Sequence, residues 1–280
     1  MFIDLHTHSA HSDGTDAPAR LMEAAAVAGL EVVGLADHDT NTGWAEASAA
    51  VGRTGVALVR AAEITASWKG SSVHVLSYLH DPDEPRLARL MADNRNLRPR
   101  RARAMVAALS RDYPITWEDV MAHAGDPKTV GRPHMADALV TAGVFPHRDD
   151  AFAGVLAADG PYYVHLAAPE PLEVVRAIRA AGGVPVIAHP FISSRGGIDD
   201  DAIAELARAG LFALEADHRD HTAGQRARAR RLAADLGLAV TGSSDYHGTG
   251  KQNRLGDGVT APDVLERIAA EGRLEVLWPG

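Results

Sequence analysis

The chain has 280 residues, of which 46% are hydrophobic, and its formal net charge at pH 7 is −9. This length suits one large core or a core with a small insertion. The acidic balance argues against a protein that wraps duplex nucleic acid, although a local arginine pocket could hold a phosphate or a short strand. No cysteine is present, which excludes disulfides and thiolate metal sites, so any metal ligands must be imidazoles and carboxylates.

Membrane and secretory segments are not predicted. No apolar run approaches the roughly 20 residues that a bilayer-spanning helix needs. The chain enters an apolar strand at Phe2, which leaves no room for a signal peptide. We therefore expect a cytoplasmic protein that makes no membrane contact.

The first predicted strand, Phe2 to Leu5, leads directly into a histidine pair. Because side chains alternate along a strand, Asp4, His6 and His8 project from the same face. Two imidazoles held in this way can bind one cation, and Asp4 is spaced to orient one of them. Asp13, beyond a serine-rich turn, can bring a carboxylate back over the strand end. A polar strand terminus with solvated histidines is the alternative for this motif taken alone.

Helices and strands alternate over the first 63 residues. The predicted elements are a helix over 16–29, a strand over 31–36, a helix over 42–51 and a strand over 56–62. Asp16 is a plausible N-cap for the first helix, with Pro18 in its first turn. His38 and Glu63 follow the two strands. This order predicts a parallel sheet, and active sites form at the carboxyl edge of such sheets.

A hairpin and then helices alone are predicted for the middle of the chain. The hairpin arms are 64–67 and 72–79, with His74 in the second arm. The helices that follow are predicted over 86–109, 117–124, 133–141 and 147–156. We interpret them as a helical insertion. Its arginine-rich run from Arg95 to Arg103 is either a solvated helix face or a contact to phosphate or nucleic acid.

The alternation of strands and helices then returns. Helices are predicted over 171–181, 199–209, 225–236 and 262–271, and strands over 184–188, 211–216 and 238–243. The three strands end at His189, at Asp217-His218 and at Asp245-Tyr246-His247. Six strands of the chain thus end in His, Asp or Glu, which random placement would rarely produce.

Together, the strand-end residues form one candidate metal cluster. It comprises His6, His8, Asp13, His38, Glu63, His74, His189, Asp245 and His247. These ligands are too many for one cation and suit two or three metals that share bridging carboxylates. Such metals lower the pKa of bound water and can stabilise both sides of a phosphoryl displacement. Mixed imidazole and carboxylate ligation favours Mn, Fe or Zn over Mg or Ca.

Six segments of the chain resemble motifs of the PHP (polymerase and histidinol phosphatase) superfamily. They are D-L-H-T-H-S-x-x-S-D-G from Asp4, A-D-H-D-T from Ala36, A-E-I from Ala62, V-H-V-L from Val73, A-H-P from Ala188 and G-S-S-D-Y-H from Gly242. The resemblance implies an α/β fold, a distorted (β/α)7 barrel with an all-helical insertion. It implies that residues 1–84 and 160–280 form the barrel domain and that 85–159 form a substrate-capping domain.

The resemblance also implies a trinuclear site with three divalent metal ions, Mn, Fe or Zn. The first ion would be held by His6, His8, Glu63 and Asp245. The second would be held by Asp13, His38 and His247, and the third by Glu63, His74 and His189. Of these residues, Glu63, Asp245 and His247 are assigned to catalysis.

The insertion resembles one branch of the superfamily. Its segment Val130-Gly131-Arg132-Pro133-His134 is similar to a G-R-P-H motif of nucleotide phosphoesterases. That branch includes nucleoside 3′,5′-bisphosphate phosphatases, AMP-binding phosphoesterases and a 5′→3′ exoribonuclease. There the Arg and His contact substrate phosphate, so Arg132 and His134 are assigned to catalysis and substrate binding. An ordinary helix start is the alternative for this segment.

Two further substrate contacts are suggested by the resemblance. His221 matches a family position near the pocket. Many relatives carry a Lys before a Pro-x-Tyr-Val segment, where this chain has Gly160. Arg195 could substitute for that Lys in substrate binding.

The expected function is that of a metal-dependent phosphoesterase acting on nucleotides or short oligonucleotides, with a metal-bridging hydroxide as the nucleophile. Three alternatives stay open: a histidinol-phosphate phosphatase or other small-molecule phosphomonoesterase, a catalytically silent metal-binding module, and a dedicated nucleic-acid binder. The acidic balance and the lack of a recognition motif count against the last. The sequence leaves open the metal, the exact substrate, the acid for the leaving group and the oligomeric state.

Overall fold

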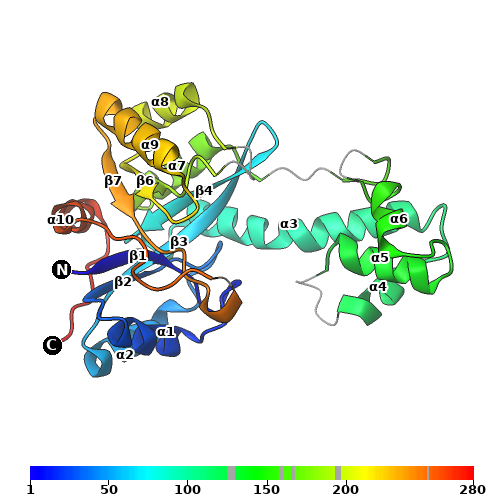
Figure 1. Cartoon of the computed structure of the whole chain (residues 1–280), viewed down its shortest axis with the longest axis horizontal. Coiled ribbons are helices and arrows are strands. Elements are labelled where there is room, and N and C mark those ends of the chain that lie inside the picture. Colours follow the sequence, from blue (N-terminus) through cyan, green and yellow to red (C-terminus); the bar gives the residue numbers. More distant parts are fainter. Residues whose placement is uncertain (125–129, 158–159, 165–167, 193–196, 251) are drawn as a thin grey trace. The chain divides into compact units, whose positions relative to one another are not determined.

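The computed structural model describes the chain except for residues 125–129, 158–159, 165–167, 193–196 and 251 (Figure 1). It divides into two compact units. The larger unit comprises Met1–Ala92 and Pro169–Gly280, and the smaller unit comprises Asp93–Ala168. Within the described residues, no helix is both long enough and apolar enough to cross a membrane.

The larger unit is built on a seven-stranded sheet whose spatial order follows the chain, from β1 to β7. The strands are β1 Ile3–Thr7, β2 Val32–Leu35, β3 Ala57–Trp68, β4 Ser71–Tyr78, β5 Val184–Ile187, β6 Ala213–Asp217 and β7 Ala239–Gly242. β4 is antiparallel to both of its neighbours, and all other pairs are parallel. The sheet is therefore mixed, whereas the sequence predicted parallel pairing around its hairpin.

The sheet curls until its first and last strands meet at their carboxyl ends. The His8 N–H donates to the Tyr246 carbonyl at 2.8 Å, and the Asp245 N–H donates to the His6 carbonyl at 3.0 Å. An isolated parallel bridge joins Thr7 to Tyr246. The fold is thus a distorted α/β barrel, and the fold class expected from the sequence is confirmed.

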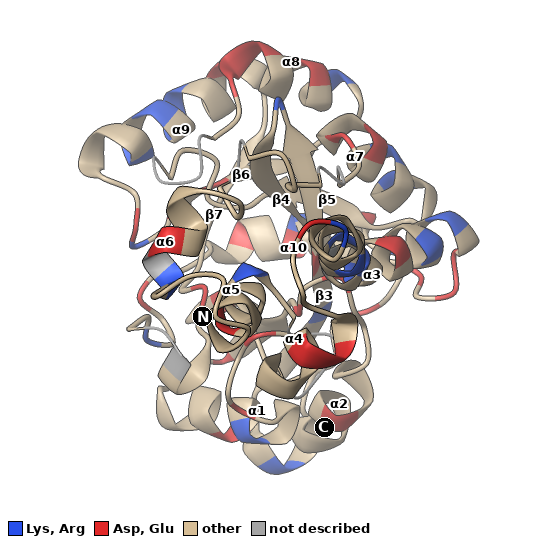
Figure 2. Ribbon diagram, turned by 90° about the vertical axis from the view of Figure 1, so that its right-hand side faces the viewer, with Lys and Arg blue, Asp and Glu red and all other residues tan. Residues whose placement is uncertain are grey.

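Helices cover the outside of the barrel. They are α1 Pro18–Val27, α2 Trp44–Thr54, α7 Pro171–Ala180, α8 Asp200–Arg208, α9 Ala223–Leu236 and α10 Pro262–Glu271, with a short 3-10 turn η2 Gly248–Gly250. α1 and α2 pack on the first three strands through one apolar cluster, and α7, α8 and α9 pack on the middle of the sheet through another. α8 and α9 carry opposite charges (Figure 2), and Arg228 pairs with Asp200 at 2.6 Å.

The smaller unit is helical and has its own apolar core. Its helices are α4 Trp117–Ala124, α5 Arg132–Thr141 and α6 Arg148–Ala153, together with the second half of α3 Pro85–Leu109, which begins in the larger unit. Met105, Val120 and Leu139 are among the buried residues of this core. Each of the four helices predicted for this region is observed within a few residues of its expected bounds.

Two local expectations were wrong. β3 is one continuous strand of 12 residues, not a strand and a separate hairpin arm. No turn-forming residue interrupts it, and β4 pairs with it from Ala61–Tyr78 to Trp68–Ser71. In addition, Asp16 does not cap α1, whose N-cap is Ala17; the Asp16 carboxylate instead accepts a hydrogen bond from the Tyr246 hydroxyl at 2.8 Å.

Candidate metal centre

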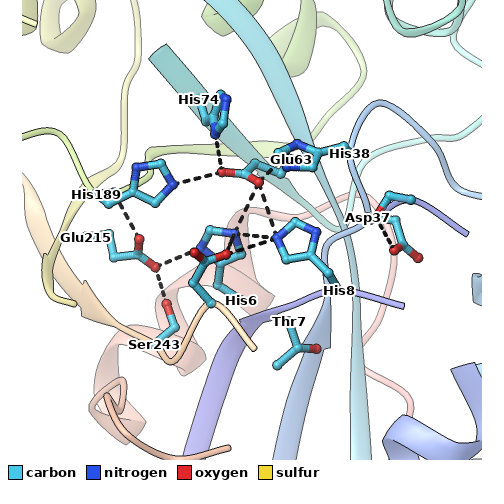
Figure 3. Close-up of polar contacts among 12 residues, drawn as sticks. His6, Thr7, His8, Asp37, His38, Glu63, His74, His189, Glu215 and Ser243 are labelled. Atoms are coloured by element: carbon cyan, nitrogen blue, oxygen red, sulfur yellow. Dashed lines mark hydrogen bonds and ion pairs between the residues drawn. The ribbon is translucent and has the colours of Figure 1, made fainter. Parts of the chain in front are cut away.

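The nine predicted ligands come together at one place in the larger unit, at the carboxyl ends of the parallel strands and in the middle of the antiparallel pair. Figure 3 shows His6, His8, His38, Glu63, His74 and His189 of this set. His6 lies in β1, and His8 and Asp13 follow that strand. His38 follows β2, and His189 follows β5. Glu63 and His74 lie inside β3 and β4. Asp245 and His247 follow β7.

Glu63 lies at the centre of the cluster, and its side chain is 1% exposed. Its Oε1 is 2.8 Å from Nδ1 of His74 and 3.1 Å from Nε2 of His189. Its Oε2 is 3.1 Å from Nδ1 of His38, 3.3 Å from Nε2 of His8 and 3.4 Å from Nε2 of His6. The two oxygens thus face different histidines, as a carboxylate that bridges metal ions must.

Three groups of side chains bring ligand atoms within 4.8 Å of one another. They are His6, His8, Glu63 and Asp245; His8, Asp13, His38 and His247; and His38, Glu63 and His74. The first group has the four members that the resemblance implies for one ion. The second also contains His8, and the third contains His38. His189 joins the cluster through Glu63.

Asp13 differs from the other members because its side chain is 54% exposed. It comes from the loop after β1, and its Oδ1 is 3.1 Å from Nε2 of His247. Asp37 anchors that loop: its carboxylate accepts the Ser9 N–H at 2.8 Å, the Ser9 hydroxyl at 2.7 Å and the Ser12 hydroxyl at 2.6 Å. A buried carboxylate that is not itself in the cluster therefore holds Asp13 near it.

The hydrogen bonds of the histidines test whether the cluster fits metal ions. Nδ1 of His247 donates to the Asp245 carbonyl at 2.8 Å, which leaves a lone pair on Nε2 when the ring is neutral. That buried Nε2 has no hydrogen bond among the described residues, yet it faces the Asp13 carboxylate. A lone pair facing an anion is stable only with a proton or cation between them. The donor set therefore fits divalent metals.

Burial and the neighbouring carboxylates shift the pKa values of the clustered histidines in opposite directions. Burial acts to lower the pKa of His8, but hydrogen bonds to Asp245 and Glu63 outweigh it and raise that pKa to about 9. Burial lowers the pKa of His38 to about 3 and that of His189 to about 4. Burial acts to raise the pKa of Glu63, but His74, His38 and His6 hold it well below its usual value. Glu63 is therefore ionised at neutral pH.

Glu215 is an important residue that the sequence analysis did not identify. It lies in β6, is fully buried, and accepts the Nδ1–H of His6 at 3.1 Å and the N–H of His189 at 2.9 Å. The Ser243 hydroxyl also donates to it. Asp4, which was expected to orient a histidine, instead accepts the N–H groups of Ser244 and Gly256. The signal for Glu215 was a charged residue inside the otherwise apolar segment 211–216.

Two members of the cluster have strained backbones, which is common at functional sites. His189 has φ of 30° and Asp245 has φ of 55°. The bond from the His189 N–H to Glu215 stabilises the first, and the bond from the Asp245 N–H to His6 stabilises the second. His218, also missed, is fully buried with Nε2 at 3.5 Å from Oδ2 of Asp245.

The expected substrate contacts lie in different places. Arg132 and His134 begin α5 in the smaller unit. His221 lies in the larger unit, where Nδ1 donates to the Ala216 carbonyl at 2.9 Å and Nε2 accepts the Phe191 N–H at 3.3 Å. Both of its ring nitrogens are thus used within the protein. Arg195 lies outside the described residues.

Comparison with known proteins extends over nearly the whole chain. The model of the PHP domain family matches residues 4–111. The chain is 31% identical to the 3′,5′-nucleoside bisphosphate phosphatase of Chromobacterium violaceum, with 99% of this chain and 98% of the relative covered. It is 30% identical to a 5′-3′ exoribonuclease of Haemophilus influenzae, covering 87% and 89%. A Bifidobacterium adolescentis structure provisionally described as a metal-dependent phosphoesterase gives a TM-score of 0.77 at 42% identity, with 96% of both chains covered.

Replacing Glu215 tests its role in metal binding. Glu215→Gln keeps the size but leaves one acceptor oxygen, so either His6 Nδ1 or the His189 N–H loses its partner. We expect Co²⁺ to bind roughly 10- to 100-fold more weakly, as measured by titration of its visible absorption. Asp217→Asn is the matched control, since Asp217 lies on the same strand and pairs with Arg230 at the surface. Equal affinities in all three proteins would contradict this role.

The raised pKa of His8 makes a prediction for the pH dependence of metal binding. A coordinated imidazole must be neutral, so metal has to displace the proton that His8 retains up to a pKa of about 9 in the metal-free protein. His38 and His189, with lowered pKa values, release no proton at neutral pH. Zn²⁺ affinity should therefore rise from pH 7 to pH 9, with proton release visible by calorimetry in buffers of different ionisation enthalpy. An affinity independent of pH would contradict this account.

Proposed function

Because this chain belongs to the PHP domain family of metal-dependent phosphoesterases, we propose that it hydrolyses phosphate esters of nucleotides or short oligonucleotides. The observation that carries the proposal is the buried Glu63 carboxylate, which faces five imidazoles with its two oxygens. In this proposal the nine clustered residues bind three divalent ions, of Mn, Fe or Zn. When bound, such ions lower the pKa of coordinated water and neutralise charge on the phosphoryl group.

The choice of a nucleotide substrate is supported by the relatives. One is named for nucleoside bisphosphates and one for RNA, and both align with most of this chain. Their shared chemistry is a phosphate ester of a nucleoside. The alternative substrate is histidinol phosphate or another small monoester, which the same metal centre would serve.

In the proposed mechanism the protein's own groups position the ester and shield the charge. Glu63 and Asp245 would hold ions together with the histidines around them, and Asp245 is positioned by the hydrogen bond from its N–H to the His6 carbonyl and by nearby His218. Asp13 and His247 would bind the ion on the solvent side, where Asp13 is exposed. Divalent ions held by these residues would neutralise negative charge on the phosphoryl group during the reaction.

The smaller unit supports a phosphate-binding role for Arg132 and His134. A cavity of about 300 Å³ there is lined by both residues, by Arg101 and by Tyr163. Nη1 of Arg132 donates to the Leu156 carbonyl at 3.1 Å, which orients the guanidinium over Tyr163. Nδ1 of His134 accepts the Gly131 N–H at 3.2 Å, so a neutral ring carries its proton on Nε2. That is the form that donates to a phosphate oxygen.

A side-by-side assay tests the proposed reaction. Phosphate release and product length are measured with adenosine 3′,5′-bisphosphate, short 5′-phosphorylated RNA and histidinol phosphate. We expect turnover of a nucleotide substrate that is lost on metal removal and restored by Mn²⁺ or Zn²⁺. Glu63→Gln should lose several orders of magnitude in turnover together with bound metal, whereas Glu173→Gln, an exposed control on α7, should not. Turnover of histidinol phosphate alone would show the nucleotide proposal to be wrong.

Arg132→Ala tests phosphate binding separately from metal binding. Loss of a charge-assisted pair costs roughly 2–4 kcal/mol, or about 30- to 1000-fold in kcat/KM. Metal content should stay at the wild-type level, because Arg132 belongs to the smaller unit. Arg132→Lys should recover only part of the loss, since an ammonium cannot form a bidentate pair. Arg148→Ala, which removes an exposed arginine of the same unit, is the control. Unchanged efficiency in Arg132→Ala on every phosphorylated substrate would contradict the assignment.

A further inference from the structure

A second charged feature of the larger unit lies between the segments that follow β6 and β7. A cavity of about 810 Å³, here called the basic hollow, is found there. It is lined by Arg219, Arg226, Tyr246, Gly248, Gln252, Asn253, Arg254 and Asp257. None of the nine clustered ligands lines it, and neither Arg132 nor His134 does. The basic hollow is therefore separate from both sites already described.

The basic hollow is positive in a protein whose net charge is −9. Its lining has three guanidinium groups and one carboxylate, that of Asp257, and Arg219 also pairs with Asp220 at 3.9 Å outside the lining. Asp257 pairs with Arg219 at 3.4 Å and accepts the main-chain N–H of Arg254 at 2.8 Å. Within the described part of the chain, no carboxylate lies within ion-pair distance of the guanidinium of Arg226 or Arg254. Two positive charges thus remain without a neutralising carboxylate.

The walls of the basic hollow belong to the same backbone segments that present the metal ligands. Nε and Nη2 of Arg226 donate to the His218 carbonyl at 3.3 and 3.1 Å. Nδ2 of Asn253 donates to the Ser244 carbonyl at 2.7 Å and to the Asp245 carbonyl at 3.2 Å. Tyr246 lies between two ligands in the sequence. The hollow therefore flanks the cluster at the carboxyl edge of the barrel.

We propose that the basic hollow is a subsite for a second phosphate of the substrate, which stays intact while a neighbouring ester reacts at the metal centre. This inference rests on the proposed function and narrows it to substrates with at least two phosphates. Guanidinium groups form bidentate hydrogen bonds with phosphate oxygens, and the amides of Gln252 and Asn253 add polar surface to the same cavity. The second phosphate could be the other phosphate of a nucleoside bisphosphate or the next phosphate of an oligonucleotide.

Arg254 is the residue to replace, because its side chain makes no hydrogen bond or ion pair within the described structure. Arg226, by contrast, also supports the His218 carbonyl, so its loss could disturb the backbone near the metal centre. Arg254→Gln removes the charge and keeps a polar side chain. Arg20→Gln removes the same charge from α1, where the side chain is 74% exposed, and controls for the change in net charge.

The test compares metal-loaded proteins on three substrates: adenosine 3′,5′-bisphosphate, a short 5′-phosphorylated RNA and p-nitrophenyl phosphate, which has one phosphate. Arg254→Gln should raise KM roughly 10- to 100-fold for a substrate with two phosphates, with kcat and metal content little changed. The change for p-nitrophenyl phosphate should be much smaller. The substrate whose KM rises identifies the source of the second phosphate. An equal loss on all three substrates, or no change on any, would overturn the proposal.

A binding measurement separates this inference from the proposed function. Calorimetry with adenosine 3′,5′-bisphosphate and with the RNA is carried out on metal-free wild type, Arg254→Gln and Arg20→Gln. Weaker binding in Arg254→Gln alone would support the subsite even if the wild type hydrolysed neither ligand, in which case the proposed function would be wrong. Equal binding by all three proteins would overturn the subsite, whatever their activity.

Discussion

The arrangement of the metal centre depends on one buried carboxylate. A charge as deeply buried as that of Glu63 is costly unless it is paired. The barrel meets this cost by directing imidazoles at both oxygens from β1, β2, β4 and β5. Those imidazoles also lie close to one another, and the Nε2 atoms of His6 and His8 are 3.0 Å apart. Such crowding of nitrogen and oxygen donors is stable only with protons or cations among them.

The sheet topology explains how Glu63 reaches that position. β3 continues past the edge at which β2 ends and turns back into β4 as an antiparallel hairpin. Glu63 and His74 can therefore stand inside these two strands, whereas His6 lies near the end of β1 and the remaining ligands follow parallel strands. The antiparallel pair thus places Glu63 and His74 beyond the point at which β3 stops pairing with the parallel strand β2. Closure between His6 and Asp245 then joins the two ends of the sheet directly beneath the ligands.

Much of the fold and the candidate site could be predicted from sequence, for local reasons. The nine clustered residues lie in short motifs beside apolar strands, and the carboxyl ends of strands converge in an α/β barrel. Glu215 was missed because its partners, His6 and His189, are far away in sequence and it follows no motif of its own. Asp4 was misassigned because alternation gives the face of a side chain but not which partner is nearest. Asp16 was misassigned because a tertiary contact with Tyr246 replaced local capping.

Exposure divides the cluster unevenly. Asp13 is open to solvent, while His6, His8, Glu63 and Asp245 are almost completely buried. An ion bound through Asp13 would be open to water and to a chelator, because that side chain is half exposed. An ion held among the buried four has no exposed ligand through which exchange can begin. Exchange at the centre would therefore be uneven: an ion bound through Asp13 would exchange with its surroundings faster than an ion bound among the buried four.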